Sequence, residues 1–411
     1  MSATESPARA ALEGLYRRAP LGMQLGLERM RDACARAGHP ERALSVVHVA
    51  GTNGKGSVCA MVEAMALASG ARVGLYTSPH LCRFAERVRV GGAPIDDATL
   101  ARHLGAALEL GPDLSFFETA TLAALLALRD AAVDLAILEV GIGGRLDATN
   151  VVPAPRVCAI TRIAFDHTEL LGATLEAIAA EKAAIAKPAV PMVVGPVAPG
   201  VRSVIERACA DAGAPTRFVD DDPSLAVSVS SAPVGLAGAH QRDNARIAWA
   251  LGDALALPIP ARARGLETVR WPGRLETIPT PRGPVLLDAA HNPDGASALS
   301  AHLAQIAPDP SKVALVFGTL ADKAWPEMID VLAPRATSRT YAIPKGRAAT
   351  DPAAIAARHP GTVARSVADA LAHARATVGD GALVVLCGSV YLVGEARALL
   401  LGLERDPPVA L

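Results

Sequence analysis

Short runs of β-branched and aliphatic residues alternate with alanine-rich segments of helical periodicity along almost the whole chain. In the first part, buried strands are predicted at residues 43–51, 72–78, 134–141, 156–163 and 190–196. Helical patterns lie between them, including residues 57–70, 118–132 and 175–187. Strands joined through helices run parallel in one sheet, and helices cover both faces of such a sheet. The alternation therefore predicts an α/β fold built on a mostly parallel sheet.

A proline-rich stretch at residues 271–284 interrupts this alternation and predicts an interdomain linker that serves as a hinge. A second alternation follows, with strands expected at residues 284–290, 312–319, 339–344 and 381–389. A length of 411 residues suggests two or three domains. We therefore expect a larger first domain over residues 1–276 and a smaller α/β domain over residues 277–411.

Composition narrows the class of protein. The net charge is −1, from 40 Lys and Arg against 41 Asp and Glu, which gives no broad positive field for nucleic acid. Aromatic residues are only 3% of the chain, so a base-stacking platform is not expected. The six cysteines include no C-x-x-C pair, the first residues are polar, and no apolar run reaches about 18 residues. We expect a cytoplasmic protein with neither a membrane nor a nucleic-acid partner.

The sharpest local signal is the glycine-rich segment HVAGTNGKGS, which lies between a predicted strand and a predicted helix. Glycines let the backbone turn tightly and present N–H groups to a phosphate, and the helix N-terminus adds a favourable dipole. Lys55 would reach the terminal phosphates, and Ser57 or Thr52 would lie near a metal. The segment departs from the common phosphate-loop pattern because a glycine separates Lys55 from Ser57. We predict nucleotide binding, the alternative being a glycine-rich turn with an incidental lysine.

Acidic and histidine residues follow two of the other predicted strands. Glu139 ends a strand and opens the segment EVGIGGRLDATN, at the sheet edge where α/β proteins bind ligands. A carboxylate near a phosphate loop is a natural Mg²⁺ ligand. Asp166, His167 and Glu169 lie in the loop after the next strand and are also potential metal ligands. The alternative for Glu139 is a cap on the next helix, and a histidine such as His167, taken alone, is more often structural.

Lys182 lies in an alanine-rich helical segment, where part of its aliphatic stem is expected to be buried. Burial lowers the pKa of a lysine, so that the amine can lose its proton. A neutral amine can take up CO₂ as a carbamate, which places a carboxylate on a long arm. The ordinary alternative is a solvated or salt-bridged helix residue.

The second domain carries weaker signals at its strand ends. Asp288 and His291 follow one predicted strand, and Asp322 and Lys323 follow another. The segment CGSVYLVGE forms a further strand–glycine–helix turn. A helix cap explains each of these about as well as a ligand contact.

Taken together, these segments resemble the folylpolyglutamate synthase/dihydrofolate synthase family, the folate members of the Mur ligases. Its markers occur in order along nearly the whole chain: GTNGKGS, TSPHL, ERVRV, FFETAT, EVGIGGRLDATN, DH, EKAAIAK, GAHQRDNA, WPGRLE, DAAHNP and GTLADK. The resemblance implies an N-terminal phosphate-loop ATPase domain of Mur-ligase type and a smaller Rossmann-like glutamate-ligase domain. Two positions depart from the usual pattern, since Ala289 and Ala184 stand where the family commonly has glycine.

The resemblance also implies site residues. Catalysis is assigned to Lys55, Glu139, His167 and Lys182. ATP binding is assigned to Asn53, Gly54, Lys55, Gly56, Ser57, Asn244, Arg274 and Asp288. Two Mg²⁺ ions are assigned to Ser78 with Glu139, and to His167 with a carbamate on Lys182. Substrate binding is assigned to Phe116, Phe117, Glu118, Leu146, Asp147 and Ala148, with smaller contributions near Gln24, Gly26 and Leu27.

The reaction that the resemblance implies is ATP-dependent amide formation through an acyl phosphate, as part of folate biosynthesis and one-carbon metabolism. L-glutamate would be added to 7,8-dihydropteroate, to the glutamyl tail of reduced folates, or to both. A monofunctional folylpolyglutamate synthase and another Mur-type amino-acid ligase are the alternatives, although little chain precedes the phosphate loop for a UDP-binding domain. The expected partners are small molecules, and the resemblance implies a monomer.

Overall fold

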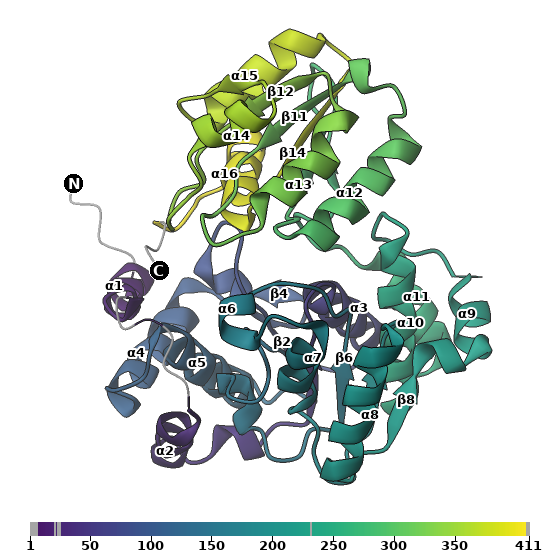
Figure 1. The fold of residues 1–411 in the computed structure, drawn as a ribbon. Helices are drawn as coiled ribbons and strands as arrows, with labels where there is room; N and C mark the ends of the chain where they lie inside the picture. Colours follow the sequence, from purple (N-terminus) through teal and green to yellow (C-terminus); the bar gives the residue numbers. More distant parts are fainter. Residues whose placement is uncertain (1–6, 20–21, 23–25, 231, 408–411) are drawn as a thin grey trace.

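The computed structural model describes residues 7–19, 22, 26–230 and 232–407 and folds into two lobes (Figure 1). The N-terminal lobe contains an eight-stranded sheet of order β4-β3-β2-β5-β1-β6-β7-β8. Its strands are β1 (Val46–Ala50), β2 (Val73–Tyr76), β3 (Val88–Val90), β4 (Ala93–Pro94), β5 (Leu135–Glu139), β6 (Val157–Ile160), β7 (Met192–Val194) and β8 (Thr216–Phe218). All neighbours are parallel except at the β2–β3–β4 edge. The predicted mostly parallel α/β sheet is confirmed.

Helices cover both faces of this sheet because successive buried strand residues point to opposite sides. Val46 packs into one core and Val47 into the other. The face that includes Val46 is covered by α1 (Pro7–Tyr16), α2 (Glu28–Arg36), α4 (Asp97–Leu110) and α5 (Phe116–Asp130), and towards β7 by α7 (Leu175–Ala183) and α8 (Pro199–Ala212). The opposite face is covered by α3 (Lys55–Ala68), α10 (His240–Ala254) and α11 (Ile259–Thr268). Two shorter helices are α6 (Thr168–Leu171) and α9 (Pro223–Ser230).

The C-terminal lobe contains a six-stranded sheet of order β13-β12-β11-β14-β10-β9. Its strands are β9 (Glu276–Ile278), β10 (Val285–Asp288), β11 (Val313–Phe317), β12 (Ser338–Tyr341), β13 (Thr362–Val363) and β14 (Leu383–Cys387). Only β9 is antiparallel to its neighbour. One face packs against α12 (Pro293–Ile306), α13 (Trp325–Leu332) and α14 (Pro352–Arg358), and the other against α15 (Val367–Val378) and α16 (Val390–Leu401).

Two local predictions differ from the structure. The stretch 271–284 is not wholly a linker, because its residues Glu276–Ile278 form β9 and pair with β10. Helix α7 ends at Ala183 instead of residue 187. The reason is Pro188, since the residue before a proline disfavours helical backbone angles and the helix ends upstream of it.

The two lobes contact each other on two sides of the space between them. On one side, Gly394 of α16 lies so close to the backbone of Leu81 that a Cβ atom there would collide with the Leu81 carbonyl oxygen. The Cys82 thiol donates to the Gly394 carbonyl at 3.4 Å, and the Asp406 carboxylate accepts the Phe84 amide hydrogen at 2.6 Å. On the other side, polar residues from the ends of β1 and β6 meet the N-terminus of α12. No helix in the described part of the chain is long and apolar enough to span a membrane.

Candidate functional site

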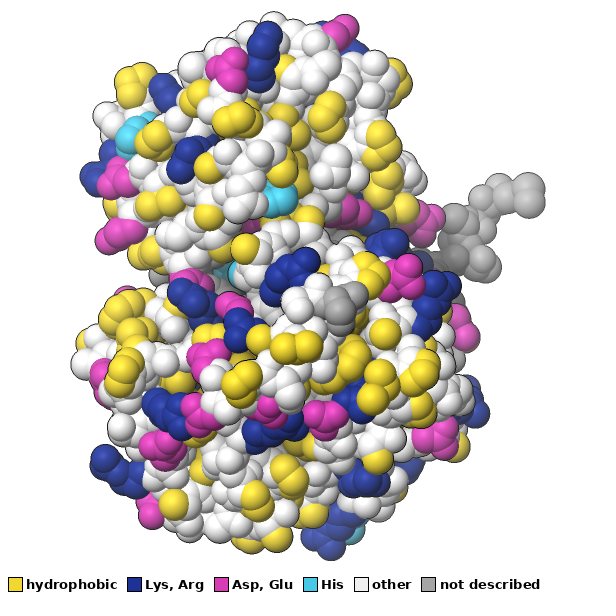
Figure 2. Space-filling model, turned by 90° about the vertical axis from the view of Figure 1, so that its right-hand side faces the viewer, with side chains coloured by type: hydrophobic (Ala, Val, Ile, Leu, Met, Phe, Trp, Pro, Cys, Tyr) yellow, Lys and Arg dark blue, Asp and Glu magenta, His cyan; other side chains and the backbone are white. Residues whose placement is uncertain are grey.

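A cavity of about 1160 Å³ lies between the lobes and is lined by residues of both. Figure 2 shows the molecule narrowing between its lobes, where acidic, basic and histidine side chains gather. The floor of the cavity comes from the carboxyl ends of β1 and β5 and from the loops that follow them, which is where parallel sheets bind ligands. Its volume is large enough for a nucleotide together with a second substrate.

The glycine-rich loop joins β1 to α3 at the centre of the cavity. All five of its predicted ATP-binding residues line the cavity: Asn53, Gly54, Lys55, Gly56 and Ser57. The Lys55 ammonium donates to the carbonyls of Gly51 and Thr52, each at 3.1 Å, so it is held over the loop. Gly54 has a φ of 92°, and a Cβ atom there would collide with the side-chain oxygen of Asn244. The loop therefore needs glycine both for its turn and for the close approach of α10.

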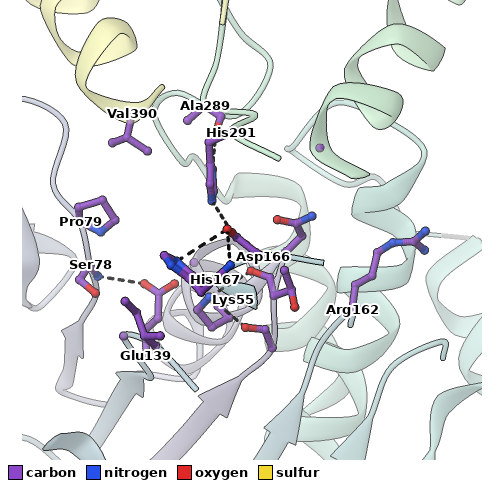
Figure 3. Close-up of a pocket in the computed structure, with 18 of the residues that line it drawn as sticks. Lys55, Ser78, Pro79, Glu139, Arg162, Asp166, His167, Ala289, His291 and Val390 are labelled. Atoms are coloured by element: carbon purple, nitrogen blue, oxygen red, sulfur yellow. Dashed lines mark hydrogen bonds and ion pairs between the residues drawn. The ribbon is translucent and has the colours of Figure 1, made fainter. Parts of the chain in front are cut away.

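Glu139 and Ser78 lie side by side because β5 and β2 are neighbours in the sheet. The Ser78 amide donates to the Glu139 carboxylate at 3.1 Å. Burial raises the pKa of Glu139, and the nearby charge of Lys55 opposes that effect. Figure 3 shows Ser78, Glu139 and His167 directed toward one space beside Lys55. The structure thus brings together a hydroxyl, a carboxylate and an imidazole beside the phosphate loop.

His167 and Lys182 complete this side of the cavity. His167 lies directly before α6 and has a φ of 51°. Burial lowers its pKa to about 4, so its imidazole is neutral near pH 7. Burial and the charge of Lys55 lower the pKa of Lys182 to about 7. Gly144 lets the loop after β5 approach α7 closely, since a Cβ there would lie 2.7 Å from the Glu181 carbonyl oxygen. Lys182 lines the cavity, but only 4% of its surface is exposed.

Asp166 forms the centre of a polar cluster between the lobes. Its carboxylate lies 2.7 Å from the Lys323 ammonium and 3.3 Å from the His291 imidazole, and it accepts a hydrogen bond from Asn292 at 3.2 Å. Burial alone would raise the pKa of Asp166, but the hydrogen bond and charge of His291 and the charge of Lys323 hold it well below its usual range. Asn53 donates to the side chains of Asn292 and Asp294 at 3.0 and 2.8 Å. This cluster fastens the phosphate loop to the C-terminal lobe.

The remaining ATP-binding candidates are one residue of α10, Asn244, and two residues near the point where the chain crosses between the lobes, Arg274 and Asp288. Asn244, Arg274 and Asp288 all line the cavity. Both oxygens of Asp288 accept backbone hydrogen bonds, from Leu275 and Ala290, each at 2.9 Å. The Asp288 carboxylate therefore fixes the crossover segment that carries Arg274.

The predicted substrate-binding residues form one wall of the same cavity: Phe116, Phe117, Glu118, Leu146, Asp147 and Ala148. The Glu118 carboxylate caps α5 through the Ser115 amide at 2.8 Å and pairs with Arg29 at 3.0 Å. The Asp147 carboxylate accepts the amides of Gly141 and Ile142 at 3.0 and 3.1 Å. Both carboxylates are thus held by the protein and shape the wall.

Some candidates are not brought to the cavity. Glu169 is exposed, and Asp322 faces Arg347 at 3.8 Å; neither is among the lining residues. Gly26 and Leu27 do not line the cavity either, and Gln24 lies outside the described residues.

No group of three or more His, Cys, Asp or Glu side chains suited to a metal occurs in the part of the chain that the structure describes.

Arg87 lines the cavity although sequence analysis did not single it out. It belongs to the segment ERVRV, one of the family markers, which does not say which of its two arginines faces the cavity. Asn292 and Asp294 were also missed as contacts of the phosphate loop, because only the packed lobes bring them to Asn53. The DAAHNP pattern before α12 was the one signal that pointed to this region.

Comparison with known proteins decides the family. The Mur ligase middle domain matches residues 49–194, and the Mur ligase glutamate ligase domain matches residues 273–390. A dihydrofolate synthase/folylpolyglutamate synthase of Bacillus subtilis is 32% identical over 422 residues, covering 94% of this chain and 97% of that protein. The chain belongs to the folylpolyglutamate synthase/dihydrofolate synthase family of Mur ligases. The family resemblance drawn from the ordered motifs is confirmed.

Solved structures of family members share the whole architecture. E. coli FolC in complex with DHPP and ADP matches with a TM-score of 0.87 and 30% identity, covering 96% of this chain and 98% of that one. A bifunctional family member with Mn, AMPPNP and L-glutamate bound matches with a TM-score of 0.85 and 34% identity, covering the same shares of the two chains. A relative from Haloferax volcanii, whose name pairs folylpolyglutamate synthase with dihydropteroate synthase, is 36% identical over 405 residues. This chain spans about half (48%) of that protein.

The burial of Lys182 predicts a specific dependence of stability on pH. The pKa of this lysine is about 7 in the fold and 10.5 when unperturbed, so the unfolded chain binds more protons between those values, and stability falls as pH decreases from 10.5 to 7. Lys182→Met removes this group. In CO₂-free buffer, we expect wild type to lose about 3 kcal/mol relative to Lys182→Met between pH 9.5 and pH 7.

Urea unfolding at several pH values measures this difference. The matched control is Lys312→Met, which removes an exposed lysine and should give a curve parallel to wild type. Parallel curves for wild type and Lys182→Met would show that Lys182 is not held in a desolvated site.

Proposed function

We propose that this chain is an ATP-dependent ligase that joins L-glutamate to a folate-type acceptor through an acyl phosphate. The observation that carries the proposal is a single cavity containing the phosphate loop, the Ser78–Glu139 pair and an aromatic wall, closed by the C-terminal lobe. Family members are named as dihydrofolate synthases and folylpolyglutamate synthases, and one solved member is in complex with DHPP and ADP. The acceptors we propose are 7,8-dihydropteroate and reduced folates, so that the enzyme is bifunctional.

The residues around the phosphate loop have separate tasks in this proposal. Lys55 and the loop amides bind the β- and γ-phosphates, and Asn244 and Arg274 bind the rest of ATP across the two lobes. The acceptor rings lie against Phe116 and Phe117. A carboxylate oxygen of the acceptor attacks the γ-phosphorus, the bond from that phosphorus to the bridging oxygen breaks, and ADP leaves. The amine of glutamate then attacks the acyl carbon, phosphate leaves, and the amine loses a proton.

The donor groups present fit two divalent cations. Ser78 and Glu139 supply oxygen ligands of the kind that Mg²⁺ prefers, and the neutral imidazole of His167 has a free lone pair for a second ion. A Mg²⁺ site of this kind is usually completed by phosphates and water, which agrees with the small number of protein ligands among the described residues. When bound, such ions neutralise phosphate charge and polarise the transferred group. One solved family member has Mn bound.

We infer that Lys182 carries a carbamate. Its amine is neutral in about half of the molecules near pH 7, because its pKa is about 7, and it lines the same cavity as His167. The Nζ lone pair attacks the carbon of CO₂, a nitrogen–carbon bond forms, and the amine releases a proton to water. The product is a carboxylate that supports the second metal ion. Gly144 packs closely against the α7 backbone at the position of this lysine.

We also propose that the chain divides near residue 276 into an ATP- and folate-binding domain and a glutamate-ligase domain. The start of β9 at Glu276 supports this division. The segment before it would be the hinge on which the lobes close and exclude water from the acyl phosphate. We also expect a cytoplasmic protein, and the family resemblance implies a monomer.

The proposed reaction is tested by ADP release. Purified enzyme with ATP, Mg²⁺ and L-glutamate should release ADP with 7,8-dihydropteroate and also with tetrahydrofolate. Both carry a pterin and an aminobenzoyl ring and offer a free carboxylate, which is the benzoate of dihydropteroate and the γ-carboxylate of the glutamyl group of tetrahydrofolate. Activity with tetrahydrofolate alone would indicate a monofunctional folylpolyglutamate synthase. Release that depends on neither acceptor, or that does not need glutamate, would contradict the ligase assignment.

The carbamate is tested by Lys182→Ala. We expect turnover to fall by about 100-fold or more while ATP binding changes little, because the variant loses support for one metal ion and leaves the phosphate loop intact. Bicarbonate with a short carboxylic acid should restore part of the activity. The control is Lys187→Ala, which removes a lysine outside the cavity and should keep wild-type turnover. Wild-type turnover in Lys182→Ala would refute the role of the carbamate.

A further inference from the structure

Arg87 is a buried charge in the cavity with no ion-pair partner among the residues that the structure describes. It ends a short 3₁₀ helix, Phe84–Arg87, and only 5% of its surface is exposed. Its Nε donates to His80 Nδ1 at 2.9 Å. Among the residues that the structure describes, no carboxylate lies within 4.0 Å of the guanidinium, and the two terminal nitrogens have no hydrogen-bond acceptor. The two terminal nitrogens are therefore available to a ligand.

The orientation of the Arg87 side chain is fixed by its neighbours. The guanidinium carbon lies 5.0 Å from the centre of the Phe84 ring and 5.6 Å from that of Phe116. The Nδ1 atom of His80 accepts the Nε hydrogen of Arg87 at 2.9 Å. Two aromatic contacts and one hydrogen bond thus hold the planar group in one direction.

The position of Arg87 matches the middle of the proposed acceptor site. Phe116, which it contacts, belongs to the aromatic wall of the cavity. On the other side, the Arg87 carbonyl accepts the amide hydrogen of Thr77 at 2.9 Å, and the next residue, Ser78, donates to Glu139 at 3.1 Å. Arg87 therefore lies between the surface proposed for the acceptor rings and the group proposed to face the γ-phosphate. The acceptor must place its own carboxylate in that interval for phosphoryl transfer to occur.

A buried guanidinium without an ion-pair partner is unfavourable for the stability of the fold unless a ligand supplies the opposite charge. Removing a cation from water without a partner destabilises the fold, and an anion that binds there relieves this penalty. The flat guanidinium presents two parallel N–H donors, which match the two oxygens of a carboxylate. Lys55 and Lys323, also in the cavity, already contact backbone carbonyls or Asp166.

We propose that Arg87 binds the carboxylate of the acceptor and holds it for attack on the γ-phosphate of ATP. This assignment rests on the proposed ligase function. One carboxylate oxygen stays hydrogen-bonded to the guanidinium, and the other attacks the γ-phosphorus as its bond to the bridging oxygen breaks.

The test compares an acid with its neutral amide. The ligands are 7,8-dihydropteroate and the analogue in which its carboxylate is replaced by a carboxamide, titrated into enzyme with AMPPNP and Mg²⁺. Arg87→Gln should weaken binding of the acid by about 10- to 100-fold, because a charged bidentate contact is lost. Binding of the amide should change by less than about twofold, and the KM values for ATP and L-glutamate should stay close to wild type.

The matched control is Arg83→Gln. Arg83 lies immediately before the same short helix, but its guanidinium faces Asp97 at 2.5 Å and is not part of the cavity lining. This variant removes the same charge and should leave the binding of both ligands unchanged. If Arg87→Gln is not recovered as folded protein, Arg87→Lys is compared in the same way. This variant should weaken binding of the acid and not of the amide, because lysine keeps the charge but cannot donate the two parallel N–H hydrogen bonds of a guanidinium.

Three results would overturn the assignment. Equal weakening of acid and amide would show that Arg87 only supports the wall of the cavity. Unchanged binding of the acid would show that it does not contact the carboxylate, and a selective rise in the KM of ATP or glutamate would place another anion there. The proposed ligase function has its own test, because it fails if wild type releases no ADP with any folate acceptor. Binding of the acid and of the amide can be compared whether or not ADP is released.

Discussion

Neutralising several negative charges in one poorly hydrated space is the constraint on which the rest of the structure depends. ATP and the carboxylate of the acceptor repel each other, and that repulsion grows when water is excluded. The protein meets this demand with Lys55 on the phosphate loop, Arg87 on the aromatic wall and Arg274 at the crossover. Glu139 adds a further negative charge to the same region and therefore fits a cation better than a bare substrate anion. The sheet makes this possible, since β1, β2 and β5 end side by side at the floor of the cavity.

Exclusion of water requires the second lobe, and the contacts between the lobes are chemically different on their two sides. Asp166 and Lys323 form a buried ion pair, with both side chains at most 8% exposed. A buried pair is costly to break, because each charge is then left without a partner. On the other side, Gly394 and Leu81 meet backbone to backbone. Ser78 lies three residues before Leu81, so the contact that holds the C-terminal lobe also holds the segment that carries a proposed metal ligand.

Much of the fold was predictable because its strands are short continuous apolar runs between amphipathic helices. The β3–β4 hairpin and β9 were not predicted, since strands of two or three residues show too little alternation to be recognised. Within the site, the phosphate loop and Glu139 follow from motif and strand position. Asp166 was expected as a metal ligand beside His167, but the structure pairs it with Lys323 and His291, about 125 or more residues away in sequence. Contacts between lobes leave no local pattern in a sequence. The lack of an ion-pair partner for Arg87 among the described residues leaves no such pattern either.

The central claim is that this cavity activates a carboxylate by transferring phosphate to it, and isotope transfer tests that claim most directly. Dihydropteroate labelled with ¹⁸O in both carboxylate oxygens is converted with ATP and L-glutamate, and the released phosphate is examined by mass spectrometry. An acyl phosphate requires one acceptor oxygen to leave with the phosphorus, so each amide formed should yield one phosphate carrying a single ¹⁸O. Phosphate without label, formed in step with the amide product, would contradict the account.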